Sequence, residues 1–315
     1  MSAVLAVDLG KTSCRAALWA DAGSAPLLAN GQGAPGLADR AGGAAAERAI
    51  LAVCGQLPGE LPPLLSLCVG AAGAAAAGEA ADLLVRRLGE LLPVDQVAVC
   101  SDSIIAHAGA LGGRPGVLLL AGTGAVVIAL AQQADGLIQV DGWGPLLGDA
   151  GGGGWIGLRG LSAALRAIDG RGPATLLEQA AVAQFGELPG LPAHLGQHDN
   201  PARLAASFAP VVARLAEDGD PVARTIMNEA GHNLAESVLA GIGRLAAPPD
   251  RIAIAGGLWK LGAALLQPLE AALRLADPPL RITPAVGDPL SGGRLLATRR
   301  DTVHEPYIHR CSVAQ

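Results

Sequence analysis

The sequence predicts an α/β chain built of two domains, and three observations carry this prediction. Short apolar segments alternate with helical patterns along the chain, which is typical of sheets connected by helical crossovers. The length of 315 residues suits two domains of ordinary size. A strand-turn-strand unit near the N-terminus also occurs again about one domain later, as a weak internal repeat.

The composition bounds the class of protein. Hydrophobic residues make up 51% of the chain and charged residues 16%, so the chain can bury a core. A net charge of -6 and an aromatic content of 2% argue against a nucleic-acid binder, which would need a basic face or stacking platforms. With no secretion signal and no long apolar run, we expect a cytoplasmic protein without a membrane span. The cysteines lack C-x-x-C spacing and are expected to be reduced thiols: Cys14, Cys54, Cys68, Cys100 and Cys311.

In the first half of the chain, the apolar patterns and turn residues predict alternating elements. We expect strands at Ala3–Val7, Cys14–Trp19, Leu65–Val69 and Val97–Cys100, and helices at Ala44–Gln56, Glu79–Leu91 and Ser103–Leu111. A cluster of turn residues at 112–115 predicts a domain boundary. We therefore expect a first domain over residues 1–112 and a second over 113–298, with the polar tail at 299–315 either packing back on the first domain or fraying.

In the second half, a glycine-dense loop at Gly142–Gly154 separates two groups of elements. We expect strands at Val117–Ala121, Val126–Leu130 and Arg251–Ala255, and helices at Leu158–Ile168, Pro210–Glu217, Val222–Leu245 and Leu258–Leu273. The hairpin formed by the first two of these strands resembles the N-terminal hairpin in design, because each delivers small residues and a threonine to a turn.

The first candidate motif is Asp8-Leu9-Gly10-Lys11-Thr12-Ser13, at the end of a buried strand. Gly10 permits a turn that directs backbone N–H groups and the Thr12 hydroxyl at an anion. Asp8 could hold Mg²⁺ directly or through water. The alternative interpretation is an ordinary hairpin turn with a solvated aspartate. The G-x-x-x-x-G-K-[ST] spacing of a phosphate-binding P-loop is absent from the sequence.

Two further glycine turns follow in the second half of the chain. Gly122-Thr123-Gly124 joins two apolar strands and could expose main-chain donors to a phosphate, or could be a common glycine hairpin. Gly256-Gly257 stands between a strand and a helix, where a ligand could approach the backbone closely, or where the helix simply packs on the strand. Each signal is weak alone, and their order along the chain is the stronger observation.

The segment Gly142–Gly151, which reads G-W-G-P-L-L-G-D-A-G, carries a family resemblance. It is similar to the G-W-G-x-x-L-G-D-E-G-S segment of the N-acetylglucosamine kinase and BadF/BadG/BcrA/BcrD ATPase group, within the actin/hexokinase superfamily. Ser101-Asp102 before a helix of small residues and Asn228-Glu229-Ala230-Gly231 in a long helix also fit. The resemblance extends from Val7 to about Ala297.

This resemblance implies two actin/hexokinase-like (ribonuclease H-like) domains with a nucleotide cleft between them. It implies a homodimer and an ATP- and Mg²⁺-dependent kinase that phosphorylates a hydroxyl of N-acetylglucosamine or a related amino sugar. The residues implied for the nucleotide are Gly10, Lys11, Thr12, Gly122, Thr123, Gly124, Gly231, Gly256 and Gly257, with Asp8 for Mg²⁺. Those implied for the sugar are Gly73, Asp102, Gly144, Asp149 and Gly153.

Asp102 is the expected catalytic base. It follows a buried strand and stands at the expected N-cap of a helix, where its carboxylate could take the proton of a sugar hydroxyl as that oxygen attacks the γ-phosphorus. The alternative is a structural N-cap, for which aspartate is among the best residues. Asp149 could likewise be a turn residue that satisfies loop N–H groups. Trp143, beside the glycine loop, is expected to pack in the core or to shape the sugar pocket.

Several positions depart from the family pattern. Ala150 and Gly152 replace its Glu and Ser, Ala125 replaces a Ser, and residues 33–36 replace an expected Asn. These departures leave open a non-catalytic nucleotide or sugar sensor as an alternative. A second alternative, an ATPase that activates a radical dehydratase through an iron-sulfur cluster, would need cysteine ligands in the second domain, and the chain has no cysteine between Leu111 and Arg310.

Overall fold

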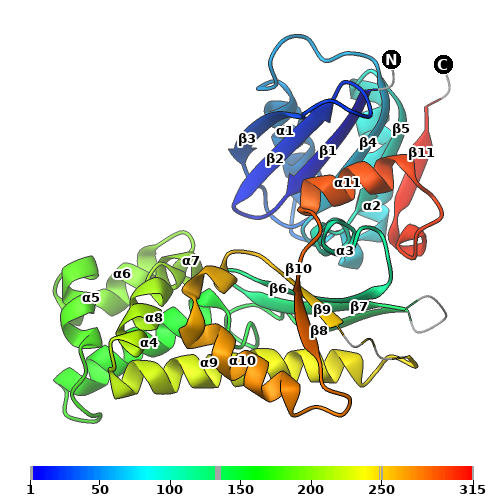
Figure 1. The fold of residues 1–315 in the computed structure, drawn as a ribbon. Helices are drawn as coiled ribbons and strands as arrows, with labels where there is room; N and C mark the ends of the chain where they lie inside the picture. Colours follow the sequence, from blue (N-terminus) through cyan, green and yellow to red (C-terminus); the bar gives the residue numbers. More distant parts are fainter. Residues whose placement is uncertain (1–2, 132–135, 248, 250, 314–315) are drawn as a thin grey trace. The chain divides into compact units, whose positions relative to one another are not determined.

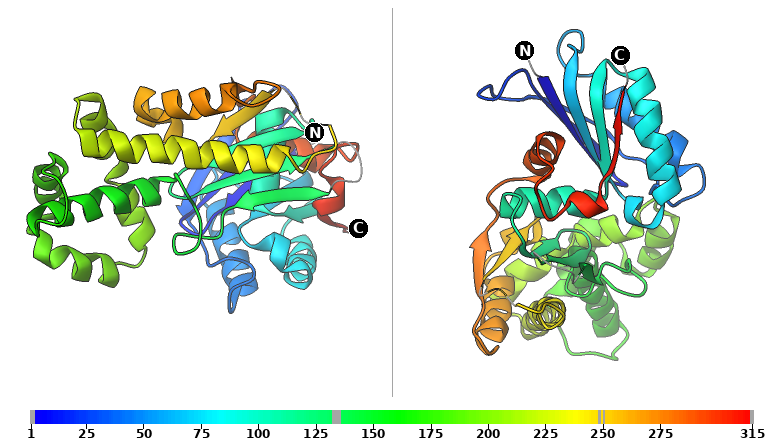
Figure 2. Two further views of the ribbon diagram at one scale, coloured as in Figure 1. Left: turned by 90° about the horizontal axis from the view of Figure 1, so that it is seen from below. Right: turned by 90° about the vertical axis from the view of Figure 1, so that its right-hand side faces the viewer.

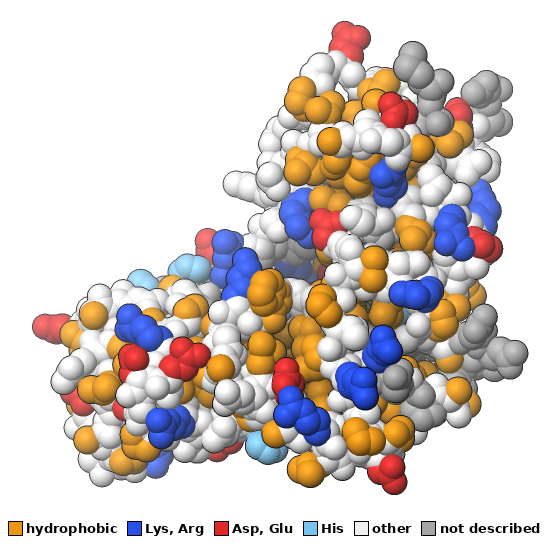
Figure 3. Space-filling view, in the orientation of Figure 1, with side chains coloured by type: hydrophobic (Ala, Val, Ile, Leu, Met, Phe, Trp, Pro, Cys, Tyr) orange, Lys and Arg blue, Asp and Glu red, His pale blue; other side chains and the backbone are white. Residues whose placement is uncertain are grey.

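The computed structural model describes residues 3–131, 136–247, 249 and 251–313. It confirms the predicted α/β class and divides the chain into two compact units (Figure 1). The first unit consists of the residues up to Pro115 and those from Ala285 onward, and the second is Gly116–Pro284. Within the described ranges, no helix is long and apolar enough to cross a membrane. Basic and acidic side chains are interspersed on the face that Figure 3 shows.

The described part of the first unit contains a six-stranded sheet in the order β11-β5-β4-β1-β2-β3. The strands are β1 (Ala3–Leu9), β2 (Ser13–Trp19), β3 (Leu27–Gln32), β4 (Leu64–Ala71), β5 (Val94–Cys100) and β11 (His309–Ser312). The helices are α1 (Gly42–Cys54), η1 (Ala74–Ala76), α2 (Gly78–Leu91), α3 (Asp102–Leu111), α11 (Pro289–Thr298) and η4 (Glu305–Tyr307). Strand β1 pairs antiparallel with β2 and parallel with β4.

Helices cover both faces of this sheet, as Figure 2 shows from the side. Alternate residues of β1 point to opposite faces. Leu5 and Val7 belong to the apolar core that α1 and α2 complete. Ala6 faces α11, and a Cβ on Gly293 of that helix would lie only 2.9 Å from the Cβ of Ala6. Small residues therefore let α11 lie close against the sheet.

The described part of the second unit contains a five-stranded sheet in the order β10-β9-β6-β7-β8. The strands are β6 (Gly116–Ala121), β7 (Ala125–Leu130), β8 (Leu137–Asp141), β9 (Arg251–Ala255) and β10 (Arg281–Pro284). The helices are α4 (Gly153–Ile168), α5 (Leu177–Phe185), η2 (Leu188–Gly190), α6 (Leu191–Gln197), α7 (Pro201–Ala206), α8 (Ala209–Glu217), α9 (Pro221–Ile242), η3 (Leu258–Leu261) and α10 (Ala263–Arg274). In both units three antiparallel strands are followed by two parallel ones, so the internal repeat is present in the connectivity.

The C-terminal segment differs from the sequence-based division at 298. Helix α11 packs on α3 and β1 of the first unit, so the chain leaves the second unit after Pro284. The approach depends on glycine, because a Cβ on Gly109 of α3 would lie 2.0 Å from the carbonyl oxygen of Asp288. The tail then adds β11 to the edge of the first sheet, antiparallel to β5.

Two helix predictions need correction. The helix expected at Leu258–Leu273 is interrupted at Gly262, whose φ of 72° is left-handed, so η3 and α10 are separate elements. Helix α4 begins at Gly153 instead of Leu158. The glycine-dense loop expected at Gly142–Gly154 therefore ends two residues earlier, where the backbone N–H groups of Gly153 and Gly154 bond to carbonyls of the neighbouring β6–β7 turn.

Candidate active site

A hydrogen bond closes the turn between β1 and β2, and a glycine of the following segment packs against this turn. The N–H of Gly10 donates to the carbonyl of Ser13 at 2.9 Å, which leaves Lys11 and Thr12 exposed at the tip. The segment after β3 lies directly on this turn, since a Cβ on Gly33 would lie 2.4 Å from the carbonyl oxygen of Gly10. Glycine at 33 therefore has a packing reason: no side chain fits there.

Asp8, at the end of β1, pairs with a residue that the sequence analysis missed. Its Oδ2 accepts a hydrogen bond from Nη2 of Arg15 at 2.5 Å, and the two residues are opposite each other in the β1–β2 register. The described residues hold no group of three or more His, Cys, Asp or Glu side chains that could form a metal site by themselves. Asp8 nevertheless fits Mg²⁺, because this ion is commonly held by one or two carboxylates, waters and substrate phosphates.

Lys11 is connected to the loop that follows β3. Its Nζ lies 3.5 Å from Oδ2 of Asp39, and the same oxygen accepts the N–H of Gly36 at 2.8 Å. Both charged side chains are exposed, so this ion pair is weak. The loop is also fixed to the end of β4, where Gly73, with a φ of 80°, leaves room for the backbone of Leu37.

Ser101 caps helix α3, and this corrects the expectation that Asp102 is the cap. The Oγ of Ser101 accepts the N–H of Ile104 at 3.3 Å, and Asp102 is the first helical residue. Oδ1 of Asp102 accepts the N–H of Ser103 at 2.9 Å. Because serine performs the capping, the carboxylate of Asp102 is not needed for it.

The surroundings of Asp102 raise its pKa to about 6. Burial is the main cause, and the negative charge of Asp8 adds to it, whereas backbone hydrogen bonds and the positive charge of Lys11 act against it. Helix α3 lies close to β4 because Gly70 leaves space for Ile105, whose Cδ1 would be 2.3 Å from a Cβ at position 70. The first unit thus brings Asp8, Lys11 and Asp102 into electrostatic contact.

The turn between β6 and β7 repeats the first one. The N–H of Gly122 donates to the carbonyl of Gly124 at 2.8 Å, and the space around Gly122 is open. Helix α4 begins against this turn, with the N–H groups of Gly153 and Gly154 donating to Gly122 and Thr123 at 2.8 Å each. The turn and the positive end of a helix therefore meet, which suits an anion.

The remaining predicted glycines divide into two kinds. Gly257 has open space around it, whereas a Cβ on Gly256 would lie 2.1 Å from the carbonyl oxygen of Ala121, so Gly256 lets β9 end close to the β6–β7 turn. Gly231 is buried, and a Cβ there would meet Pro268 of α10 at 2.7 Å. Its small size serves the packing of α9 on α10.

The loop between β8 and α4 places Asp149 on the second turn. Oδ1 of Asp149 accepts the N–H of Ala125 at 3.4 Å, and its carboxylate would lie 2.7–2.9 Å from a Cβ on Gly124. Burial raises the pKa of Asp149. Gly144 has a φ of 87° and open space around it. Trp143 is 70% exposed, which corrects the expectation of core packing.

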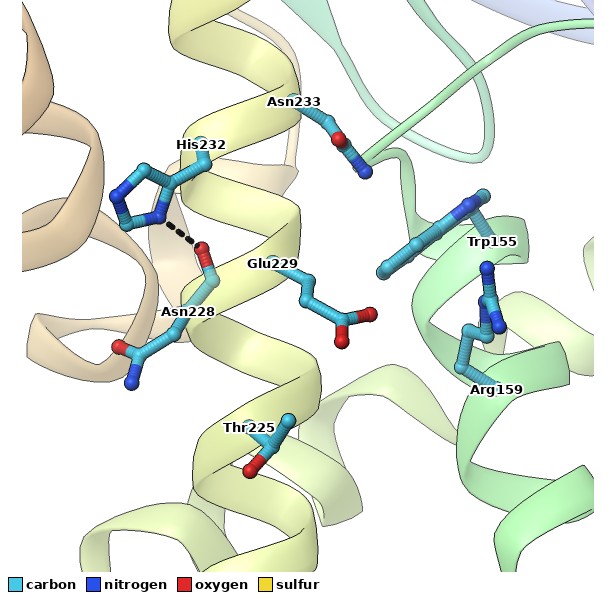
Figure 4. Close-up of a pocket in the computed structure, with 7 residues that line it drawn as sticks. All are labelled: Trp155, Arg159, Thr225, Asn228, Glu229, His232 and Asn233. Carbon is cyan, nitrogen blue, oxygen red and sulfur yellow. Dashed lines mark hydrogen bonds between the residues drawn. The ribbon is translucent and has the colours of Figure 1, made fainter.

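A polar hollow of about 460 Å³ lies elsewhere on the second unit, between α4 and α9 (Figure 4). On the α4 side of the hollow, the guanidinium of Arg159 lies over the ring of Trp155, 5.0 Å from the ring centroid. The α9 side carries a hydrogen bond between Nδ1 of His232 and the carbonyl oxygen of Asn228. None of the predicted site residues lines this hollow, so it does not belong to the site described above.

Two sheets of the same connectivity, each with a glycine-containing turn at its first hairpin, define an actin/hexokinase-type fold. The BadF/BadG/BcrA/BcrD ATPase family matches residues 5–292, and the chain belongs to this family. The resemblance drawn from the Gly142–Gly151 segment is thereby confirmed.

Relatives with known sequences or structures agree with this placement. An N-acetylmuramic acid/N-acetylglucosamine kinase of Clostridium acetobutylicum is 28% identical over 250 residues, covering 77% of this chain and 80% of the relative. A protein of Chromobacterium violaceum, provisionally assigned as an N-acetylglucosamine kinase, superposes with a TM-score of 0.71 at 27% identity, covering 94% of this chain and 99% of that one. A ROK family glucokinase of Streptomyces griseus shares the fold, with a TM-score of 0.57 at 18% identity over 94% and 99% of the two chains.

Proposed function

We propose that this protein is an ATP-dependent sugar kinase that transfers the γ-phosphoryl group of ATP to a hydroxyl of an amino sugar, with Asp102 as the general base. The observation that carries the proposal is the state of Asp102. Its carboxylate is free of the capping role, and burial raises its pKa to about 6. A carboxylate of that kind is ionised at neutral pH and yet more basic than an ordinary aspartate, which suits proton abstraction.

The chemistry follows from this carboxylate. Asp102 accepts the proton of the attacking hydroxyl while the hydroxyl oxygen forms its bond to the γ-phosphorus and the bond to the β-γ bridging oxygen breaks. The product is a sugar phosphate, and ADP leaves. Phosphoryl transfer requires mainly positioning and charge stabilisation, so the base needs only a well-placed acceptor oxygen.

The nucleotide phosphates would be held by the Gly10–Thr12 and Gly122–Gly124 turns. The exposed Lys11 and Thr12 side chains would supply a positive charge and a hydroxyl donor, and the N-terminal end of α4 would add the positive end of the helix dipole. When bound, Mg²⁺ would neutralise phosphate charge, with Asp8 as the protein group that holds it directly or through water. Arg15, which pairs with Asp8, would hold that carboxylate in its orientation.

The sugar identity rests on the relatives. The names of the Clostridium and Chromobacterium proteins favour N-acetylglucosamine and N-acetylmuramic acid as the first substrates to test. Gly73, Gly144, Asp149 and Gly153 are the proposed sugar contacts besides Asp102. Gly153 contributes through its position, since its own N–H is already bonded to the β6–β7 turn. On the family resemblance we also propose a homodimer through the second unit.

A panel of sugars tests the assignment. ADP release from Mg-ATP is measured with N-acetylglucosamine, N-acetylmuramic acid, glucosamine and glucose, and phosphorylated product is identified by mass spectrometry. We expect sugar-dependent ADP release with at least one amino sugar. ATP binding by calorimetry without turnover on any of the sugars would instead favour a nucleotide or sugar sensor.

A further inference from the structure

The loop between Asp141 and Asp149 is not held in place by burial. Trp143 is 70% exposed, Leu146 94% and Leu147 87%. A segment whose large apolar side chains face solvent gains almost nothing from the hydrophobic effect to offset the entropy of ordering it. Some other interaction must therefore fix the conformation of this loop.

The carboxylate of Asp141 supplies that interaction. Its Oδ1 accepts the N–H of Asp149 at 2.7 Å, and its Oδ2 accepts the N–H of Ala150 at 2.8 Å. Both oxygens of one charged group thus close the loop at its base, across eight and nine residues of sequence. Hydrogen bonds to an ionised acceptor are shorter and stronger than neutral ones.

The backbone on both sides of the loop is adapted to this contact. Asp141 has a φ of 61° and Asp149 a φ of 57°, both in the left-handed region that non-glycine residues rarely adopt. A Cβ on Gly148 would lie 2.2 Å from Oδ1 of Asp141, so only glycine lets the carboxylate reach the far side of the loop. Strained positions of this kind persist where the surrounding structure over-determines them.

The contact reaches the proposed ligand site through Asp149. With its N–H held by Asp141, Asp149 directs its own carboxylate onto Gly124 and Ala125 of the β6–β7 turn. Its carbonyl accepts the N–H of Gly152 at 2.9 Å, immediately before α4 begins. Asp141 itself is placed by β8, where it pairs with Val126 of β7.

We propose that Asp141 is a positioning residue, whose carboxylate clamps the base of the 142–148 loop and so fixes Asp149 for sugar binding. The part that concerns the sugar rests on the proposed function, whereas the clamp itself does not. In this proposal Asp141 acts through Asp149. The sequence shows no sign of this role, because Asp141 stands one residue before the family-like segment.

Two substitutions separate the clamp from the backbone conformation. Asp141→Gly removes the carboxylate and suits a φ of 61°, so the backbone is not strained. Asp141→Asn keeps the shape but presents an NH₂ group to one of the two N–H donors, so one hydrogen bond is lost. Asp21→Asn is the matched control, because Oδ1 of Asp21 also accepts two backbone N–H groups, those of Gly23 and Ser24, in a turn of the first unit.

The first readout is chymotrypsin cleavage within the 142–148 loop, followed by mass spectrometry on the folded protein without ligand. We expect both Asp141 variants to be cleaved there at least about fivefold faster than the wild type, because the loop opens more often. The Asp21→Asn protein is expected to match the wild type. Wild-type cleavage rates in both Asp141 variants would overturn the clamp, whatever the kinase assay shows.

The second readout uses turnover. We expect both Asp141 variants to raise the sugar KM by at least about tenfold, with a much smaller change in the ATP KM, because Asp149 is no longer held in place. A faster-cleaved loop with an unchanged sugar KM would overturn the link to Asp149. If no sugar is turned over by the wild type, the proposed function fails, and the cleavage rates still decide whether Asp141 clamps the loop.

Discussion

His107 of α3 and His304 of the C-terminal tail are both fully buried, and Nδ1 of His107 lies 2.9 Å from Nε2 of His304. One ring nitrogen donates and the other accepts, so the hydrogen bond requires at least one neutral ring. Burial, with a contribution from His107, lowers the pKa of His304 to about 3. The pair ties the tail to the helix that begins with Asp102.

This pair should make stability depend on pH. The unfolded chain takes up a proton on His304 near pH 6.5, whereas the folded chain does so only near pH 3. The contribution of the neutral His304 ring to the free energy of unfolding is therefore fully present above pH 6.5. It is lost as pH falls toward 3, at up to about 1.4 kcal/mol per pH unit. We expect urea unfolding of His304→Phe to lack this slope between pH 6.5 and 4. An identical slope in wild type and variant would contradict the assignment.

Asp102 should give the free energy of unfolding the opposite pH dependence, so that its effect stabilises the folded state as pH falls. Its folded pKa of about 6 exceeds that of the free side chain, so ionisation at neutral pH destabilises the folded state. We expect Asp102→Asn to raise the free energy of unfolding at pH 7.5 by up to roughly 3 kcal/mol, and to lose most of this gain near pH 4, where the native carboxyl is protonated. A destabilised Asp102→Asn at pH 7.5 would show that the carboxylate has a structural role.

Gly122 offers a test of the nucleotide site, because the space around it is open. A Cβ at this position meets no protein atom within 4 Å, and the rest of a valine side chain would occupy space next to the proposed phosphate position. We expect Gly122→Val to melt within about 2 °C of the wild type and to weaken binding of a non-hydrolysable ATP analogue by at least about tenfold in calorimetry. Gly196→Val, at an equally open position of α6, is the control. Unchanged affinity in Gly122→Val would place the phosphates elsewhere.

The pH profile of turnover should report the environment of Asp102. With saturating ATP, we expect kcat/KM for the sugar to fall as pH drops through about 6, where the free base becomes protonated. Lys11 lowers the pKa of Asp102 through its charge, so Lys11→Met should move this limb to higher pH. Lys260→Met, on the second unit, should leave the limb in place. If Lys11→Met leaves the limb at the same pH, the charge of Lys11 does not affect the pKa of Asp102.

The sequence predicted the strands and turns that local signals define. Apolar runs that end in glycine marked β1, β4, β6 and β9, because a buried strand that delivers a tight turn needs both features. The edge strands β3, β8, β10 and β11 were missed, since their exposed residues break the apolar pattern. Residues 285–298, which include α11, lie in the first unit and not in the expected second domain, because the glycine contacts between α11 and α3 join residues about 180 positions apart in the sequence.

The candidate site was predicted in the same uneven way. The order of the motifs along the sequence indicated Asp102 and the glycine turns. The cap at Ser101 differs by one residue from the expected one, a shift that sequence patterns rarely resolve. Arg15 and Asp141 act through register and loop closure, and neither leaves a pattern in one sequence. Gly231 matched a family position, yet its contact with Pro268 gives it a packing role.

The kcat of Asp102→Asn decides whether Asp102 is the catalytic base. Asparagine keeps the size of the side chain, and Ser101 continues to cap α3, so the variant should fold and bind the ATP analogue as the wild type does. Without an acceptor for the hydroxyl proton, kcat with the best sugar should fall by roughly 10²- to 10⁴-fold. A kcat within about threefold of the wild type would contradict the account of Asp102 as the base.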